Sequence, residues 1–398
     1  MVSTKAEPRF WRDNVLLDGG ALVAGVANAV YHVVVARMLG PLQYGILAAL
    51  GTIVLLLEIP VAMIALVYTR QGSSPRRLWG LNLRWVAVGC LVWALVFWSA
   101  PTLGRVFSLP SGLVILFSLA IVPAYAYGVN LGVMQWAGRF MWAGALIAWD
   151  AVGRTLGALV AYIGSMGLYG LIFVGPLVTL ADGVVSWVGS RHAARYAREE
   201  GLASFGGLPN AAVVGALALV MTSADVLAAK HALLPRAAGF YGGLATLGRA
   251  PVYFASAVGT VLLSTSQREP GAGWRYLWYS LAVMAALGGL GLGLYATAGH
   301  FLIVATLGAR FLPMARELVP YTTAMVLESF LLVALYYGAA RGRWELTAIG
   351  AVTFTAWMAA IWTTHRLDQV VAWSLVIMLA GAGAALLGAA LMTRAGLD

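Results

Sequence analysis

The sequence predicts an all-α integral membrane protein in which about twelve transmembrane helices form two six-helix bundles. Hydrophobic residues make up 61% of the 398 residues and charged residues only 10%, whereas soluble domains contain about 45–50% apolar and roughly 25% charged residues. The apolar residues fall into segments of about 20 residues, the length that crosses a bilayer as a helix. Short sequence phrases recur in the second half of the chain, which indicates an internal duplication.

Twelve segments are long and apolar enough to cross the hydrocarbon core of a bilayer. They are 14–37, 44–69, 83–101, 112–135, 140–164, 167–189, 210–231, 239–265, 276–298, 317–340, 346–365 and 370–393. Their apolar runs are continuous and lack the in–out alternation of membrane barrel strands, which argues against a barrel.

The basic residues lie in short runs between the apolar segments. The pI of 9.9 therefore reflects membrane topology, and we expect no nucleic-acid partner. With the N-terminus placed in the cytoplasm, 16 Lys and Arg side chains fall on the inner side and 7 on the outer side. The excess of basic residues in cytoplasmic loops predicts a multi-pass protein of the inner (plasma) membrane with both termini cytoplasmic. The first apolar run continues past the small-residue triplet 27–29, so we expect an uncleaved helix rather than a signal peptide.

The two halves of the chain share a pattern of Gly and Pro. LGPLQYGILAAL at 39–50 matches LLPRAAGFYGGL at 233–244 at its Leu, Pro, Gly and final Leu positions. Further matches follow in the same order, namely Gly104 and Phe107 with Gly308 and Phe311, Gly138-Arg139 with Gly342-Arg343, Pro60 with Pro251, and Pro123 with Pro320. Six helices per half is an even number, which predicts a parallel repeat about an axis along the membrane normal.

This repeat predicts the domain organisation. We divide the chain into an N-terminal bundle (1–189), a cytoplasmic linker (190–209) and a C-terminal bundle (210–398). Proline lacks the backbone N–H that continues a helix, so we expect the four mid-helix prolines to kink or break their helices. The single cysteine, Cys90, excludes an internal disulfide and a cysteine-based metal site.

Three stretches resemble a known family. ARMLGPLQYGILAAL (36–50), GVMQWAGRFMWAGAL (132–146) and ADVLAAKHALLPRAAGFYGGLATLGR (224–249) are similar to polysaccharide-export flippases. These form the O-antigen (Wzx-type) branch of the multidrug/oligosaccharidyl-lipid/polysaccharide (MOP) exporter superfamily. The resemblance implies a V-shaped pair of six-helix bundles around a central cavity. It also implies transport of a polyprenyl-diphosphate-linked oligosaccharide from the inner to the outer leaflet, alongside membrane lipids and other polysaccharide-assembly membrane proteins.

Two other functions stay open. Multidrug exporters of the same superfamily share this architecture, so a MATE-like multidrug or cation antiporter is the main alternative. A membrane glycan polymerase or ligase is disfavoured, because the outer loops are short and carry no paired carboxylates or metal-ligand spacing. We therefore expect a transporter without catalytic residues, bound metal or cofactor.

Ionisable groups at mid-bilayer mark candidate sites, because each costs roughly 2.5–3.5 kcal/mol to insert. Asp150 and Arg154 are four residues apart, share a helix face and are expected to pair. The pair is either purely structural, or Arg154 faces the cavity and binds the diphosphate while Asp150 holds it in place. An arginine suits this task because its planar guanidinium meets two phosphate oxygens at once.

The second half offers a similar set of candidates. Arg249 either contacts the cargo or pairs with Asp225 on the adjacent helix. Lys230 either contributes to substrate binding or extends its amine to the outer headgroups. Asp182, near the inner surface, is expected to make interfacial or helix contacts.

Two glutamates are candidates for coupling transport to an ion gradient. Glu58 and Glu328 lie near the middle of their apolar segments, where a carboxyl group can exchange H⁺ or bind Na⁺. Alternatively, each is a neutral carboxyl hydrogen-bonded to a neighbouring helix. Glu58 precedes Pro60 by two residues, and a proline frees a backbone carbonyl close to the acid.

Overall fold

The computed structural model describes residues 7–71, 73–194, 209–268 and 273–394. Within these ranges the chain is almost entirely helical and contains no strand. Most of the predicted linker 190–209 lies outside the described residues, which end at 194 and resume at 209. The helical fold class predicted from continuous apolar runs is therefore confirmed.

The chain divides into two compact units. Unit 1 comprises Met1–Leu39 and Ile53–Ser204, and unit 2 comprises Gly40–Thr52 and Phe205–Asp398. The segment Gly40–Thr52, which the sequence-based boundaries include in the first bundle, thus packs with the second half of the chain. In this segment the observed boundary between the two units differs from the predicted one, which divides the chain only at the linker.

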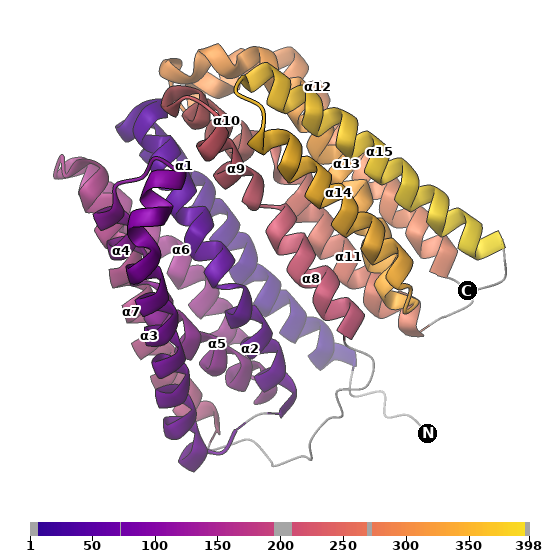
Figure 1. The fold of residues 1–398 in the computed structure, drawn as a ribbon. Coiled ribbons are helices and arrows are strands. Elements are labelled where there is room, and N and C mark those ends of the chain that lie inside the picture. Colours follow the sequence, from indigo (N-terminus) through magenta and orange to yellow (C-terminus); the bar gives the residue numbers. More distant parts are fainter. Residues whose placement is uncertain (1–6, 72, 195–208, 269–272, 395–398) are drawn as a thin grey trace. The chain divides into compact units, whose positions relative to one another are not determined.

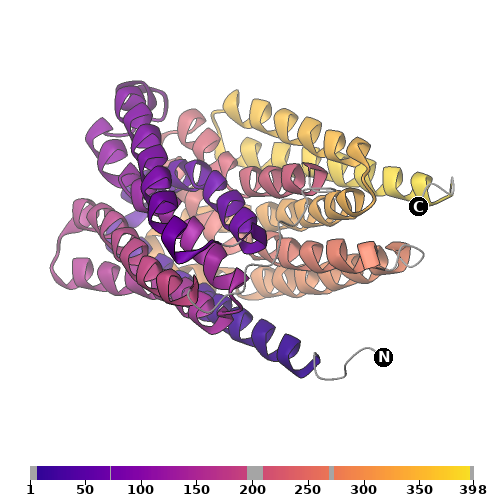
Figure 2. The same ribbon diagram turned by 90° about the horizontal axis from the view of Figure 1, so that it is seen from below.

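Unit 1 is built from seven helices, one of which it shares with unit 2. They are α1 (Glu7–Leu57), α2 (Ile59–Gln71), α3 (Pro75–Val106), α4 (Ser111–Ser118), α5 (Ile121–Trp136), α6 (Phe140–Ile163) and α7 (Gly167–Ala194). Unit 2 adds α8 (Pro209–Met221), α9 (Ala224–Ala232), α10 (Pro235–Gly248), α11 (Ala250–Arg268), α12 (Gly273–Thr306), the 3-10 helix η2 (Ala309–Met314), α13 (Ala315–Ala340), α14 (Trp344–Trp362) and α15 (Leu367–Arg394). Within each unit the long helices run side by side (Figures 1 and 2).

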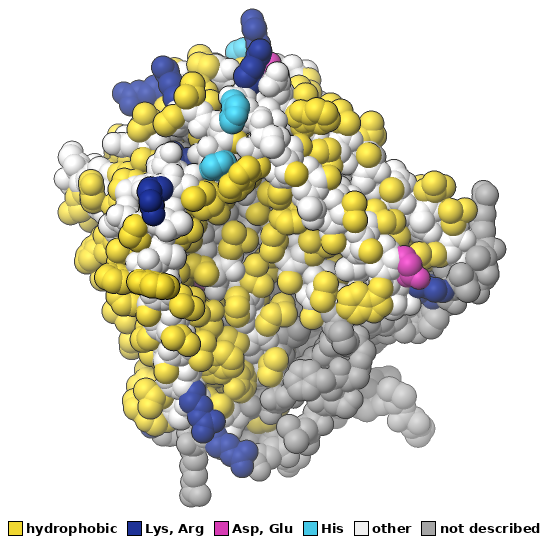
Figure 3. Space-filling model, viewed as in Figure 1, with side chains coloured by type: hydrophobic (Ala, Val, Ile, Leu, Met, Phe, Trp, Pro, Cys, Tyr) yellow, Lys and Arg dark blue, Asp and Glu magenta, His cyan; other side chains and the backbone are white. Residues whose placement is uncertain are grey.

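The helices identify a multi-pass membrane protein. Among the described residues, ten helices are long and apolar enough to cross a membrane, or eleven if the bent pair Pro235–Gly248 and Ala250–Leu263 forms one span. One of the ten, Gly19–Thr69, has 51 residues and would extend about 75 Å as a straight helix, more than twice a bilayer core. It covers most of the predicted span 14–37 and all of the predicted span 44–69. Hydrophobic side chains also cover much of the face in Figure 3, with Lys and Arg near its upper and lower edges.

The repeated phrase that follows the first span of each half marks a break in a helix. Gly40 has φ 66° and ψ 176°, a conformation that glycine adopts without strain. Pro41 then begins the next helical stretch, as Pro235 begins α10. A proline suits the first turn of a helix because its missing N–H has no helical partner there.

The two copies of this phrase pack against each other inside unit 2. A Cβ atom built on Gly45 would lie 2.9 Å from the Cα atom of Gly239, and one built on Gly239 would collide with the carbonyl oxygen of Pro41. Such distances are far below ordinary van der Waals contact, so only glycine allows the two backbones to approach this closely. The Tyr44 hydroxyl is also 2.5 Å from the Thr246 hydroxyl across the same contact.

A second pair of repeated glycines has matching backbone geometry. Gly138 has φ 69° and Gly342 has φ 68°. The following amides, Arg139 N–H and Arg343 N–H, donate to the carbonyls of Met134 and Gly338 at 2.9 and 2.8 Å. The two glycines that the sequence comparison pairs therefore begin similar turns in the two halves, with the same glycine φ and the same hydrogen bond from the following amide.

Three of the four repeated prolines begin a new helix. Pro60 is the second residue of α2, Pro123 the third residue of α5 and Pro251 the second residue of α11. Each therefore follows a break that interrupts a predicted span. Pro320 instead lies within the continuous helix α13.

We predict that Gly239→Ala lowers the stability of the folded protein, because the added methyl group collides with the Pro41 backbone. Overpacking of this kind costs roughly 1–3 kcal/mol. The measurement is the thermal unfolding midpoint of the purified protein in detergent.

Gly51→Ala is the matched control for this substitution. Gly51 belongs to the same segment, and nothing lies within 4 Å of a Cβ built there, so alanine should leave stability unchanged or raise it by up to about 1 kcal/mol. Equal midpoints for the two variants would contradict the close glycine contact.

Candidate functional site

Unit 2 contains a buried ion pair between Arg249 and Asp225. Arg249 Nη2 contacts Asp225 Oδ2, and the two side chains are only 4% and 0% exposed. The Tyr241 hydroxyl donates to the same carboxylate oxygen at 2.7 Å, and Arg249 Nη2 donates to the Tyr321 hydroxyl at 2.9 Å. The pairing that the sequence offered as one alternative for Arg249 is therefore present, and it closes this arginine off from its surroundings.

The pair lies where two helices are interrupted. Arg249 occupies the break between α10 and α11, which are bent by 47°. Its Nη1 group donates at 2.7 Å to the carbonyl of Thr222, which lies in the break between α8 and α9. The guanidinium thus satisfies a backbone acceptor that an uninterrupted helix would have used internally.

Glu328 is buried beside this pair. Its side chain is 0% exposed and belongs to α13, the most buried of the candidate spans. Both of its carboxyl oxygens lack a hydrogen-bond partner among the described residues, as does Asp225 Oδ1. Arg249 and Asp225 are the charged groups close enough to interact with it electrostatically. An unpaired carboxyl in such surroundings is stable only when it is neutral or holds a cation.

Lys230 lies five residues beyond Asp225 on α9. Its side chain is 3% exposed, and the structure shows no hydrogen bond or ion pair for it among the described residues. Within the described part of unit 2, Lys230 therefore lacks the counter-charge and the hydrogen-bond acceptors that Arg249 has. It stays a candidate for contact with an anionic group.

Unit 1 contains another ion pair, in the middle of α6. Arg154 Nε donates to Asp150 Oδ1 at 3.0 Å, and Arg154 Nη2 contacts Asp150 Oδ2. The contact is bidentate, as expected for residues four apart on one helix face. Unlike Arg249, Arg154 is 42% exposed, and its second Nη group has no partner among the described residues. It is therefore held by a carboxylate while keeping donors free for an anion.

Further ionisable groups surround this pair. Asp182 of α7 is 1% exposed and lies within side-chain hydrogen-bonding reach of Asp150, although its own Oδ1 has no partner in the described structure. Glu58 and Tyr31 interact electrostatically with Arg154. The sequence predicts only interfacial or helix contacts for Asp182, and no sequence pattern indicates that it approaches Asp150.

Small residues bring α1 against α6 and so place Tyr31 beside the arginine. A Cβ built on Gly20 would collide with the Gly144 backbone. The Thr155 hydroxyl donates at 2.8 Å to the carbonyl of Ala27. Small-residue contacts and polar bonds of this kind are the usual means by which helices associate in membranes.

The helix breaks in the two units share one local geometry. The Glu58 carbonyl accepts from Val61 N–H at 2.8 Å and Ala62 N–H at 3.4 Å, and the Arg249 carbonyl accepts from the amides three and four residues later at 3.0 and 3.4 Å. In each case a proline follows two residues after the ionisable residue. The repeat thus places an acid at the break in unit 1 and a base at the break in unit 2.

Among the described residues, no group of three or more His, Cys, Asp or Glu side chains is arranged to hold a metal ion. The acidic clusters described above contain an arginine at their centre, which is unlike a metal site.

Comparison with known proteins identifies the fold. No protein-family model and no curated protein sequence matches the chain. Among solved structures, lipid II flippase MurJ in an inward closed conformation matches with a TM-score of 0.71 and 12% identity, over 94% of this chain and 87% of that one. A multidrug resistance MATE family transporter of the MOP superfamily matches in its inward-facing conformation (TM-score 0.66, 11% identity, 93% and 96% coverage). A multidrug resistance MATE family transporter in an outward-facing conformation matches as well (TM-score 0.64, 13% identity, 98% and 96% coverage).

These matches cover nearly the whole chain at low sequence identity. They establish that the chain has the fold of MOP superfamily transporters. The neighbours themselves are transporters and flippases. The O-antigen flippase branch and the polysaccharide cargo stay predictions.

We predict that Asp225→Asn destabilises the protein far more than Asp150→Asn. The first substitution leaves the buried Arg249 without its counter-charge, which costs about 3–5 kcal/mol, and the second breaks a partly exposed pair worth at most about 1 kcal/mol. Thermal unfolding of the purified proteins measures the difference.

The double variant Asp225→Leu/Arg249→Met serves as the control, because it removes both buried charges and should recover much of the lost stability. Similar small shifts for Asp225→Asn and Asp150→Asn would show that the unit 2 pair is solvated rather than buried.

Proposed function

We propose that this protein is a flippase that moves a polyprenyl-diphosphate-linked oligosaccharide from the cytoplasmic to the outer leaflet by alternating access. The MOP transporter fold supports a transport function, and the flippase among the structural neighbours supports a lipid-linked cargo. The observation that carries the proposal is Arg154, a partly exposed arginine held by Asp150 in the middle of a membrane-spanning helix.

The physical problem of such a flippase is the dehydration of a charged headgroup. An ionised group cannot enter hydrocarbon without a compensating partner, because its desolvation penalty is far too large. A guanidinium fixed at mid-membrane supplies that partner through charge-assisted, two-pronged hydrogen bonds to phosphate oxygens. Asp150 restricts the rotamers of Arg154, so less side-chain entropy is lost when the anion binds.

The two arginines have different roles in this proposal. Arg249 uses its donors on Asp225, Thr222 and Tyr321, so it positions the broken helices of unit 2 and meets cargo only if that pair opens. Lys230, which has no such partners among the described residues, is the second anion-binding candidate. We place both termini in the cytoplasm, where the cargo is loaded.

We assign energy coupling to the buried carboxyl groups. Glu328, together with the unpartnered Asp225 Oδ1, offers oxygens that hold either H⁺ or Na⁺. Glu58, at the helix break of unit 1, is the corresponding acid near the proposed cargo site. When such a group gains or loses its charge, the free energy of burying it changes. This change shifts the equilibrium between the conformations in which the group is buried and those in which it is accessible.

A cation or multidrug antiporter is the second candidate function. One observation favours it: three carboxyl groups, those of Glu58, Asp150 and Asp182, lie around a single guanidinium. If all three were ionised, the site would be negative and would attract a cation instead of a diphosphate. The MATE transporters among the structural neighbours are consistent with this candidate.

We predict that Arg154→Gln blocks glycan export without reducing the amount of protein in the membrane. Loss of a charge-assisted phosphate contact of about 1.5–3 kcal/mol corresponds to roughly a 10- to 100-fold drop in transport at limiting cargo. The measurement is extraction of lipid-linked glycans from a deletion strain that carries each variant, together with labelling that reports which leaflet they occupy.

Arg105→Gln, at an exposed helix end, is the matched control and should export normally. Normal export by the Arg154→Gln strain would remove the proposed cargo site. Drug sensitivity of the deletion strain without any glycan defect would instead support the antiporter.

We predict that Glu328→Gln leaves the protein folded but makes transport insensitive to the ion gradient, because a neutral amide of the same shape cannot bind and release H⁺ or Na⁺. Proteoliposomes with an imposed pH or Na⁺ gradient provide the measurement. Glu345→Gln, at an exposed position of α14, should respond to the gradient like the wild type. A full response by Glu328→Gln would place coupling elsewhere.

A further inference from the structure

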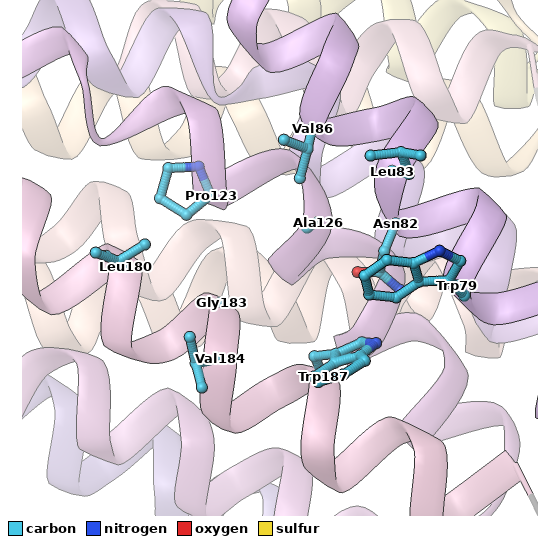
Figure 4. Close-up of a pocket in the computed structure, with 10 residues that line it drawn as sticks. All are labelled: Trp79, Asn82, Leu83, Val86, Pro123, Ala126, Leu180, Gly183, Val184 and Trp187. Carbon is cyan, nitrogen blue, oxygen red and sulfur yellow. The ribbon is translucent and has the colours of Figure 1, made fainter.

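A groove opens on unit 1 between α3 and α7, with α5 as its floor (Figure 4). Its volume is about 240 Å³, smaller than the pockets of about 300–1,000 Å³ that enclose drug-sized ligands. Apolar side chains form its walls, among them Leu83 and Val86 of α3 and Leu180 and Val184 of α7. A Cβ built on Gly183 would lie 3.1 Å from Pro123 Cβ, so α7 sits directly on the floor helix.

Hydrogen bonds fix the three helices around this groove. Asn82 of α3 donates to Asn130 Oδ1 of α5 at 3.0 Å. Asn130 in turn donates to Ser186 Oγ at 3.1 Å and accepts from Ser190 Oγ at 2.8 Å, both on α7. Because these groups are buried and hold one another, the spacing of α3 and α7 is set before anything binds.

Two polar atoms at the groove have no partner among the described residues. Asn82 lines the groove, is 7% exposed, and its Oδ1 atom accepts no hydrogen bond. Trp187 Nε1 donates none. The Trp187 ring lies 5.5 Å from the ring of Trp79 at the end of the groove (Figure 4). Paired tryptophans are typical of the membrane–water interface.

The face of α7 that lines the groove ends in a cation. Leu180, Gly183, Val184 and Trp187 line it, and Arg191 continues this face one turn further. The Arg191 Cζ atom lies 4.8 Å from the centre of the Trp187 ring, and no carboxylate pairs with Arg191 in the described part of the chain. From Leu180 to Arg191 the helix rises about 16 Å, roughly one leaflet of hydrocarbon.

We propose that this groove binds one acyl chain of an anionic glycerophospholipid whose phosphate is held by Arg191. The tail fills the apolar space, the glycerol region lies between Trp79 and Trp187, and the headgroup meets the guanidinium. The ester oxygens of such a lipid offer an acceptor to Trp187 Nε1. The lipid belongs to the leaflet that contains the C-terminal end of α7, which the distribution of basic residues assigns to the cytoplasm.

Polarity favours this lipid over the tail of a polyprenyl carrier. A polyprenyl chain is hydrocarbon throughout and would leave the Trp187 Nε1 donor unsatisfied. The groove also lacks an ionisable side chain at mid-depth, where a transported diphosphate would need one. The inference stands on the membrane-spanning fold and is independent of the cargo.

The test is native mass spectrometry of the delipidated full-length protein, titrated separately with phosphatidylglycerol, phosphatidylcholine and undecaprenyl phosphate. We expect tighter binding of phosphatidylglycerol than of phosphatidylcholine. Arg191→Gln should weaken phosphatidylglycerol binding about fivefold, the typical effect of one basic residue at an anionic surface, and should leave phosphatidylcholine binding unchanged. Val184→Phe, which fills the groove, should reduce the binding of both phospholipids.

Two substitutions serve as matched controls, with thermal unfolding measured for every variant. Arg84→Gln changes an exposed arginine of α3, and Val185→Phe enlarges an exposed valine of α7; neither residue lines the groove. Both should bind lipid like the wild type. The proposal is overturned if Arg191→Gln and Val184→Phe bind phosphatidylglycerol as the controls do. It is likewise overturned if phosphatidylcholine binds as tightly as phosphatidylglycerol, or if undecaprenyl phosphate displaces phosphatidylglycerol at equal concentration.

Discussion

Charged groups inside a bilayer have to be compensated within the protein, and the rest of this structure depends on that constraint. Arg249 meets it with a carboxylate, a tyrosine hydroxyl and a freed backbone carbonyl, and is fully enclosed. Arg154 meets it with Asp150 alone and stays partly open. Arg249 therefore stabilises the broken helices of unit 2, whereas Arg154 keeps hydrogen-bond donors accessible to an anion in unit 1.

The repeat explains why both arrangements occur in one chain. Each half contains a helix that stops and restarts two residues before a proline, with nearly identical hydrogen bonds to the carbonyl at the break. A break of this kind exposes polar backbone that hydrocarbon cannot satisfy, so an ionisable side chain beside it both needs and provides partners. Glu58 and Arg249 occupy that position with opposite charge.

Local backbone chemistry made much of the fold predictable from sequence. Continuous apolar runs indicated the spans, and Gly40, Gly138 and Gly342 marked turns because their positive φ values suit glycine. The ion pair of Asp150 and Arg154 followed from a spacing of four. Contacts between helices were not predictable in this way: the approach of Asp182 to Asp150 and the network around Asn130 depend on how α5, α6 and α7 pack. For the same reason the sequence offered Arg154 and Arg249 as equivalent candidates, although only one of them is accessible.

The path of α1 has a consequence for biogenesis. Its stretch Gly40–Thr52 belongs to unit 2, where Gly45 crosses Gly239, a residue that leaves the ribosome much later. At about 5–20 residues per second, translation of the intervening chain takes roughly 10–40 s. During that time the segment Gly40–Thr52 lies in the bilayer without the helix that contains Gly239. It is solvated by lipid or held by the insertion machinery. The two compact units therefore do not coincide with the two halves of the polypeptide, because unit 2 cannot be complete until a segment made early and a helix made late have met.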